Sequence, residues 1–272
     1  MSHASTTGHG DAAPPPTDQR ERATSRPGRG PATVALVLVG LVLVLAAVGV
    51  TTLLLVSALW QRSDTVVLTS PLVPADASTG TDVTVTSDCG GVELTEAAVS
   101  EVTTTAEIRW AFERPAISSE ARDGSVVIDF DCPLLSLGYL RASTLLIEVP
   151  VGSSVDVRNT AGGVRADGLS GELSLRSEAG AVDGVGLRSP QVTADSEAGG
   201  VTLAFDAAPA AATALSSAGG VTVLVPDDGT AYDVDASTSA GSTTITVDTD
   251  PGADRSITAR SSAGAVEVGF TG

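Results

Sequence analysis

A column of small polar side chains recurs through the C-terminal half of the chain, where hydroxyl groups could act as nucleophiles. The column consists of Asn159, Ser177, Ser196, Ser216, Thr238 and Ser261. A hydroxyl attacks a substrate only when a neighbouring base such as His or Lys activates it. The chain has no Lys, and both of its His residues, His3 and His9, lie near the N-terminus. The column therefore predicts structural hydrogen bonds between neighbouring repeats and no enzyme active site.

Cys89 and Cys132 are the two cysteines of the chain and stand 43 residues apart. Outside the cytoplasm such a pair is expected to form a disulfide, and the alternative is two buried, unpaired thiols. A bond here would connect an early repeat to the strands that follow it. It would contribute about 2–4 kcal/mol to stability.

Acidic residues gather in turns, but their spacing does not predict a metal site. The segment DTDPGAD, Asp248 to Asp254, holds three carboxylates beside a Pro-Gly turn, and Asp227 and Asp228 precede Gly229. Calcium favours oxygen-rich loops, yet the EF-hand spacing is absent. We interpret these segments as solvated turns. His3 and His9, five residues apart in a flexible segment, make no convincing metal site either, and no cofactor is predicted.

A polysaccharide-cleaving enzyme is a weaker alternative. Outward acids such as Glu178 and Glu197 could pair between neighbouring repeats, and sugar hydrolysis uses paired carboxylates. A sugar site also needs a shaped cleft with some apolar wall. The repeats offer only three aromatic residues for it, namely Phe205, Tyr232 and Phe270. We therefore predict that the protein is not an enzyme.

The elements that position these residues are repeats built around an Ala-Gly pair. The Ala recurs at 161, 179, 198, 218, 240 and 263. Spacings of 18 to 23 residues indicate stacked repeats. In a strand, side chains alternate between faces, so Val192, Ala194, Ser196 and Ala198 are expected to face inward. The Gly allows a corner, after which a second short strand begins. Successive copies stacked about 4.8 Å apart would share one narrow core.

An earlier repeat, Val83 to Leu94, places Cys89 at the Ala position. Between it and Val155, residues 106–113, 125–132 and 143–152 are predicted to be strands of an N-terminal sheet or cap. The fold class that follows is all-β, with a single β-solenoid or β-helix-like domain over residues 81–272.

An uncharged apolar segment precedes the repeats. Residues 32–60 are long enough to cross a bilayer, for which about 20 residues suffice. The alternative is a cleaved signal peptide, with Val56 to Ala58 as its cleavage site. Four Arg before the segment, against Arg62 just after it, predict a cytoplasmic N-terminus. Residues 1–31 are predicted to be a disordered tail and 61–80 a linker. No Cys lies near the span, which excludes a lipoprotein anchor.

The charge of the chain is strongly negative. The formal net charge is −18, and residues 61–272 hold eleven Arg against thirty acids, a net of −19. Such a surface would repel phosphate backbones, so nucleic acid is excluded as a partner. Fifteen basic residues that are all Arg suggest a high-GC bacterial source.

The stretch LLIEVPVGSSVDVRNTAGGVRADGLSGELSLRSEAGAVDGVGL, Leu145 to Leu187, resembles the bacterial "putative adhesin" β-strand-repeat family, a group of envelope proteins. The resemblance covers roughly residues 80 to 270. It implies a β-solenoid and an envelope location, and it supplies no catalytic residues to transfer.

These features together predict a single-pass protein of the bacterial plasma membrane with its β domain outside the cytoplasm. Its expected role is non-catalytic, with an acidic surface for adhesion or contact with a cell-wall polymer or envelope protein. The alternative is an envelope-stress or signalling component whose cytoplasmic tail engages a partner. The sequence does not identify the ligand.

Overall fold

The structure is a computed structural model that describes residues 31–59, 62–71, 81–110, 113–122, 124–133 and 143–272. It contains one helix, α1 (Pro31–Leu59), and a large β-region. The chain divides after Thr52 into two compact units. Most of α1 belongs to the first unit, and the β-region belongs to the second. The predicted disordered tail, apart from Pro31, lies outside the described residues, as do His3 and His9.

Helix α1 coincides with the predicted apolar segment. Its side chains are described from 39 to 53, and every large apolar side chain among them is exposed, from 49% at Leu53 to 65% at Leu43. Among the residues whose side chains the structure describes, which in α1 are 39–53, no helix is both long and apolar enough to cross a membrane.

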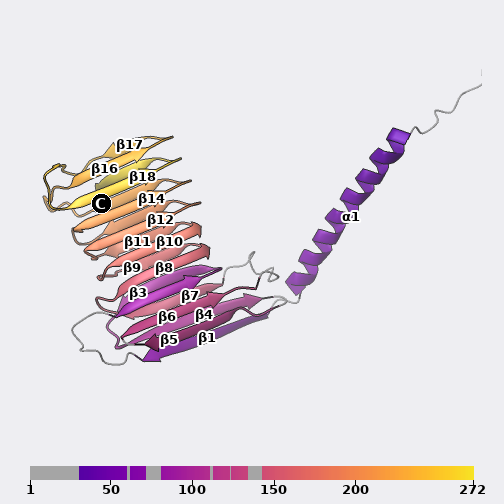
Figure 1. Ribbon diagram of the computed structural model, residues 1–272, viewed down its shortest axis with the longest axis horizontal. Helices are drawn as coiled ribbons and strands as arrows, with labels where there is room; N and C mark the ends of the chain where they lie inside the picture. The colour runs from indigo at the N-terminus through magenta and orange to yellow at the C-terminus, as the bar shows by residue number, and fades with distance from the viewer. Residues whose placement is uncertain (1–30, 60–61, 72–80, 111–112, 123, 134–142) are drawn as a thin grey trace, which may run out of the picture. The chain divides into compact units, whose positions relative to one another are not determined.

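The β-region consists of two large sheets, so the all-β prediction is confirmed (Figure 1). Sheet A runs in the order β1 (Arg62–Pro71), β4 (Glu101–Trp110), β7 (Thr144–Pro150), β3 (Gly91–Ala97), β9 (Val164–Asp167), β11 (Val182–Leu187), β13 (Val201–Phe205), β15 (Val221–Val225), β19 (Val266–Phe270) and β17 (Thr243–Ile245). Sheet B runs in the order β16 (Asp233–Thr238), β18 (Ser256–Ser261), β14 (Ala211–Ser216), β12 (Gln191–Ser196), β10 (Leu173–Ala179), β8 (Ser154–Ala161), β2 (Asp82–Ser87), β6 (Ser125–Asp131) and β5 (Ala116–Arg122).

Each repeat forms what we call a rung, two consecutive strands around a corner with the first in sheet B and the second in sheet A. The rungs are β2/β3, β6/β7, β8/β9, β10/β11, β12/β13, β14/β15, β16/β17 and β18/β19. Neighbouring rungs pair in parallel and in the register of the sequence repeat. Leu173, for example, lies opposite Val155 on one side and Val192 on the other.

The order of the rungs departs from the expected succession along the chain at both ends. Rung β2/β3 lies between β6/β7 and β8/β9, and the last rung of the chain, β18/β19, lies between β14/β15 and β16/β17. The physical reason at the second end is burial. Ile257 and Val268 of the inserted rung are fully buried, whereas Ile245 of the outer rung is 41% exposed. The more polar rung therefore occupies the end of the stack.

The segments predicted as an N-terminal cap are strands, and part of them closes the other end of the stack. Strand β4 pairs antiparallel with both β1 and β7, and β5 pairs antiparallel with β6. Strands β6 and β7 continue the parallel stack instead. The predicted linker, 61–80, contains β1, all ten residues of which pair with β4.

The core lies between the two sheets and is built mainly from Val, Leu, Ile and Ala. Its inward positions alternate with exposed ones, as in β12, where Val192, Ala194 and Ser196 are buried. The expectation that Ala198 continues this inward face is wrong, and the equivalent Ala179, Ala218, Ala240 and Ala263 are likewise exposed. Strand β12 ends at Ser196, so the two-residue alternation stops there and the corner turns Ala198 outward.

Candidate functional site

The parallel register brings outward-facing polar side chains of sheet B together at the start of four neighbouring strands. Asp156 of β8 lies between Thr84 of β2 and Ser174 of β10, and Thr193 of β12 follows Ser174. A shallow groove of about 490 Å³ lies over these strands. It is lined by Asp82, Val83, Thr84, Ser154, Val155, Asp156, Glu172, Leu173, Ser174, Gln191 and Thr193.

The groove combines carboxylates with hydroxyl and amide groups and is open to solvent. Its acids are Asp82, Asp156 and Glu172, and Asp156 accepts a hydrogen bond of 2.8 Å from Arg158 Nη2. No aromatic residue and no His, Lys or Cys is among the lining residues. The groove can therefore bind a polar or cationic ligand through hydrogen bonds, but it offers no activated nucleophile.

The predicted polar column lies inside the stack, away from this groove. Every member except Thr238, which is half-buried, is buried. Each donates a hydrogen bond of 2.8 to 2.9 Å to a glycine carbonyl of a neighbouring rung: Asn159 to Gly90, Ser177 to Gly162, Ser196 to Gly180, Ser216 to Gly199, Ser261 to Gly219 and Thr238 to Gly264. Their partners are backbone carbonyls and not one another, so these side chains connect the corners of neighbouring rungs by hydrogen bonds.

A stacked column of glycines explains why these carbonyls are within reach. Each corner glycine approaches the corner of a neighbouring rung so closely that a Cβ would come within 3.0 Å of the backbone there. These glycines are Gly162, Gly180, Gly199, Gly219, Gly264 and Gly241. Any other residue would force the corners apart. The glycine and its hydrogen-bonding neighbour thus form one structural unit.

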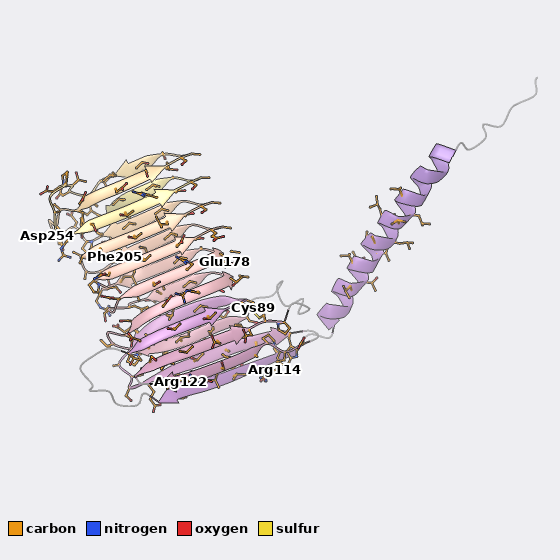
Figure 2. The ribbon with its side chains drawn as sticks, viewed as in Figure 1. Cys89, Arg114, Arg122, Glu178, Phe205 and Asp254 are labelled. Carbon is orange, nitrogen blue, oxygen red and sulfur yellow. A yellow bond between two sulfur atoms is a disulfide. The ribbon has the colours of Figure 1, made fainter. Side chains whose placement is uncertain are left out.

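Cys89 and Cys132 are joined by a disulfide, with their Cα atoms 6.0 Å apart. Cys89 is buried at the corner of the first rung (Figure 2). Cys132 directly follows β6. The bond connects two rungs that are neighbours in sheet B. It is remote in sequence from the groove residues of β10 and β12.

Sequence reasoning missed Glu96, a carboxylate that accepts four hydrogen bonds. Its side chain is 6% exposed. One oxygen accepts hydrogen bonds from the backbone and hydroxyl of Ser170 and from Gly152 N, and the other accepts one of 2.9 Å from Arg188. Burial raises the pKa of Glu96, but these hydrogen bonds outweigh it and hold the pKa below its usual value. These partners all lie in the segments that connect one rung to the next along the chain, so we interpret the role of Glu96 as structural.

The acidic turns carry no metal cluster. Within the described part of the chain no group of three or more His, Cys, Asp or Glu is placed to hold an ion. Asp228 and Asp250 instead accept hydrogen bonds from the backbone of Thr230 and Gly252, each two residues further on. That pattern is typical of Asp-containing turns.

Glu178 and Glu197, considered as a catalytic pair, occupy equivalent exposed positions at two neighbouring corners. Neither lines the groove. Of the three aromatic residues that could wall a sugar site, Phe205 and Tyr232 are fully buried and Phe270 is half-buried. They are therefore part of the core or packed against it.

No family model and no curated protein matches the chain. The solved structures that are similar to it include three bacterial proteins. The first is a putative cell adhesion protein from Clostridium sporogenes, 12% identical, covering 77% of this chain and 100% of its own, with a TM-score of 0.45. The second is a putative adhesin from Bacteroides fragilis, 12% identical, covering 76% of this chain and 97% of its own, with a TM-score of 0.41. The third is a putative adhesin from Parabacteroides merdae, 7% identical, covering 76% of this chain and 95% of its own, with a TM-score of 0.25. At these TM-scores the likenesses establish neither family nor function.

Proposed function

We propose that the chain is a bacterial plasma-membrane protein whose β-region is a β-solenoid outside the cytoplasm. There it would present a non-catalytic, acidic surface to a cell-wall polymer or an envelope protein. The observation that carries this proposal is the groove on sheet B, which gathers carboxylates and hydroxyls from four strands without an activating group. These side chains can donate and accept several hydrogen bonds with a polar ligand.

The anchor in this proposal is α1. Its 29 residues contain no charge, and at 1.5 Å per residue the helix is about 44 Å long, more than the roughly 30 Å of hydrocarbon in a bilayer. Large apolar side chains such as Leu41, Leu43 and Leu45 are exposed. In water this surface would be unfavourable, whereas lipid would cover it on all sides.

The solenoid in this proposal rests on the pairing pattern. Every rung contributes one strand to each sheet and pairs in parallel with its neighbours, and the rungs share one core. Each added rung extends the same two faces, so outward side chains form regular rows. Such rows are typical of surfaces that bind extended, repetitive ligands.

Binding of the full chain to isolated cell envelopes tests the proposed role. The protein in detergent should bind saturably at physiological salt. The double variant Asp156→Asn, Glu172→Gln should bind about tenfold more weakly, because two charged acceptors are lost. Glu267→Gln, an exposed acid on sheet A, serves as the matched control and should bind normally. Absence of saturable binding by the wild type would contradict the proposal and favour a role for the N-terminal tail.

A further inference from the structure

The end of the stack leaves one edge of sheet B open. Among the described strands, β16 is the outermost there and pairs only with β18. On the side away from β18, Tyr232, directly before β16, forms a parallel bridge with Thr249, so the open part of the edge begins at Val234. Asp233 N and Ser239 N donate to carbonyls at the two ends of β18, at 2.8 and 3.1 Å. Backbone groups alternate in direction along a strand. The N–H and C=O groups of Val234, Ala236 and Thr238 therefore point to the open side, which we call the β16 edge.

The β16 edge has no Pro, no bulge and no basic residue, and it is not very short; its charged side chains, Asp233 and Asp235, are both acidic and would repel an acidic strand but not a basic one. Its six residues contain no Pro and no Arg, and they pair with β18 without a register shift. The other three outer strands differ. Strand β17 has three residues, β1 ends in Pro71, and β5 carries Glu120 and Arg122.

The inward side chains of β16 are incompletely covered. Val234 and Ala236 are half-buried, whereas their register partners in β18, Ile257 and Ala259, are fully buried. A further strand beside β16 would supply the missing cover. Its inward side chains would have to be small and apolar to continue the narrow core.

The surroundings of the β16 edge are strongly acidic. Residues 226–256 contain seven Asp and one Arg, a net charge of −6. Asp233 is exposed, and Asp235 is paired with Arg260. The single Arg of this stretch, Arg255, donates to the carbonyls of Ala208 and Pro209. A second copy of this chain would bring the same negative charge, so a cationic partner is electrostatically favoured.

We propose that the β16 edge binds an extended segment of a partner protein that alternates basic residues with small apolar ones. The segment would add a strand to sheet B. Its backbone would pair with Val234, Ala236 and Thr238, its apolar side chains would cover the inward face, and its basic side chains would lie beside Asp233 and the acidic turns. This site deepens the proposed binding role by naming a contact surface distinct from the groove.

A labelled eight-residue peptide of alternating Arg and Val tests the site, with fluorescence anisotropy on the purified full chain in detergent. Saturable binding is expected. Two further peptides carry N-methyl groups on the Arg residues or on the Val residues. A paired strand turns only one set of its N–H groups toward β16, so one methylated peptide should bind at least about tenfold more weakly and the other should bind normally.

Two variants locate the binding. Ala236→Pro removes an N–H that faces the open side, where Pro is tolerated in a sheet, and Val234→Arg places a charge that repels a basic strand. Both should lose peptide binding, and thermal unfolding checks that each remains folded. Asp183→Asn on sheet A is the control and should bind the peptide normally.

Three outcomes would overturn the proposal. The first is that the unmodified peptide does not bind to the wild type. The second is that both methylated peptides bind equally and that both variants still bind the unmodified peptide. The third is that the wild type forms a concentration-dependent dimer that Ala236→Pro abolishes. The second would indicate adsorption to the acidic turns, and the third would indicate a second copy as the occupant. Envelope binding that is equal for wild type and Ala236→Pro would leave the proposed function intact while separating it from this site.

Discussion

At the scale of residues, the corners are held by a repeated pair, a buried polar side chain and a stacked glycine. The hydroxyl of Ser196 donates to the carbonyl of Gly180, and Gly199 lies against the same carbonyl. A column that resembles a row of nucleophiles in the sequence is thus a row of hydrogen-bond donors. Its position was predictable from the sequence, because a polar residue on an inward face must find a partner.

Replacing Ser196 by Ala should lower the free energy of unfolding by about 1–2 kcal/mol, because the Gly180 carbonyl loses a buried partner. Ser174→Ala, on the exposed face of β10, should change it by less than about 0.5 kcal/mol. Urea unfolding of both variants measures the difference. Equal stabilities would show that the Ser196 hydroxyl does not stabilise its corner.

Glu96 should make stability depend on pH on the acid side. Its pKa in the folded chain lies below the usual value of 4.5, so the unfolded chain binds the proton more readily. The contribution is therefore complete above about pH 4.5 and is lost as pH falls through the lower, folded-state pKa. Glu96→Gln should lower stability at pH 7 and flatten the decline below pH 4.5. A variant with the same acid-side slope as wild type in urea unfolding would contradict this role.

Sequence alone could not place Glu96. Its partners Gly152, Ser170 and Arg188 lie 56, 74 and 92 residues away and meet it only because their rungs stack. A lone Glu at the end of an alternating strand gives no signal of such contacts. The groove on sheet B was missed for a similar reason, since it depends on the register between four strands.

At the scale of elements, the Ala-Gly spacing predicted the strands and corners, but it could not predict the order of the rungs. Every rung carries a similar alternation, so pairing with either neighbour is compatible with the local sequence. The choice depends on non-local burial, which places the apolar rung β18/β19 inside and the more polar β16/β17 outside. The extent of β12 was also misjudged at the exposed Ala198, because the strand ends at Ser196 and the corner begins earlier than expected.

Hydrogen exchange can test this rung order directly. Amides of Val234, Ala236 and Thr238 face the open side of β16 and should exchange rapidly, whereas those of β18, paired on both sides, should be protected. Strand β18 would then be more protected than β16, although it comes later in the chain. The reverse pattern, with β18 exchanging faster than β16, would indicate that the rungs follow chain order.

At the scale of the whole molecule, the proposed role requires α1 to hold the chain in a membrane. Leu43→Arg with Val44→Arg places two charges mid-helix, each costing about 2.5–3.5 kcal/mol in a bilayer. The variant should move from the membrane pellet to the soluble fraction on alkaline extraction. Leu146→Arg, on the exposed face of β7, should remain in the pellet like wild type. Identical fractionation of both variants would argue against the anchor.

The most direct test of the proposed location is selective cleavage between the anchor and the repeats. A site for a specific protease is inserted between Leu59 and Arg62, so that the cut precedes β1, which pairs with β4. The protease is added to intact spheroplasts that express the full chain. Release of the fragment that ends at Gly272, with the N-terminal part retained in the membrane, is the expected result. If cleavage occurs only after the spheroplasts are lysed, the β-region lies inside the cell, and its proposed role as an outward binding surface is wrong.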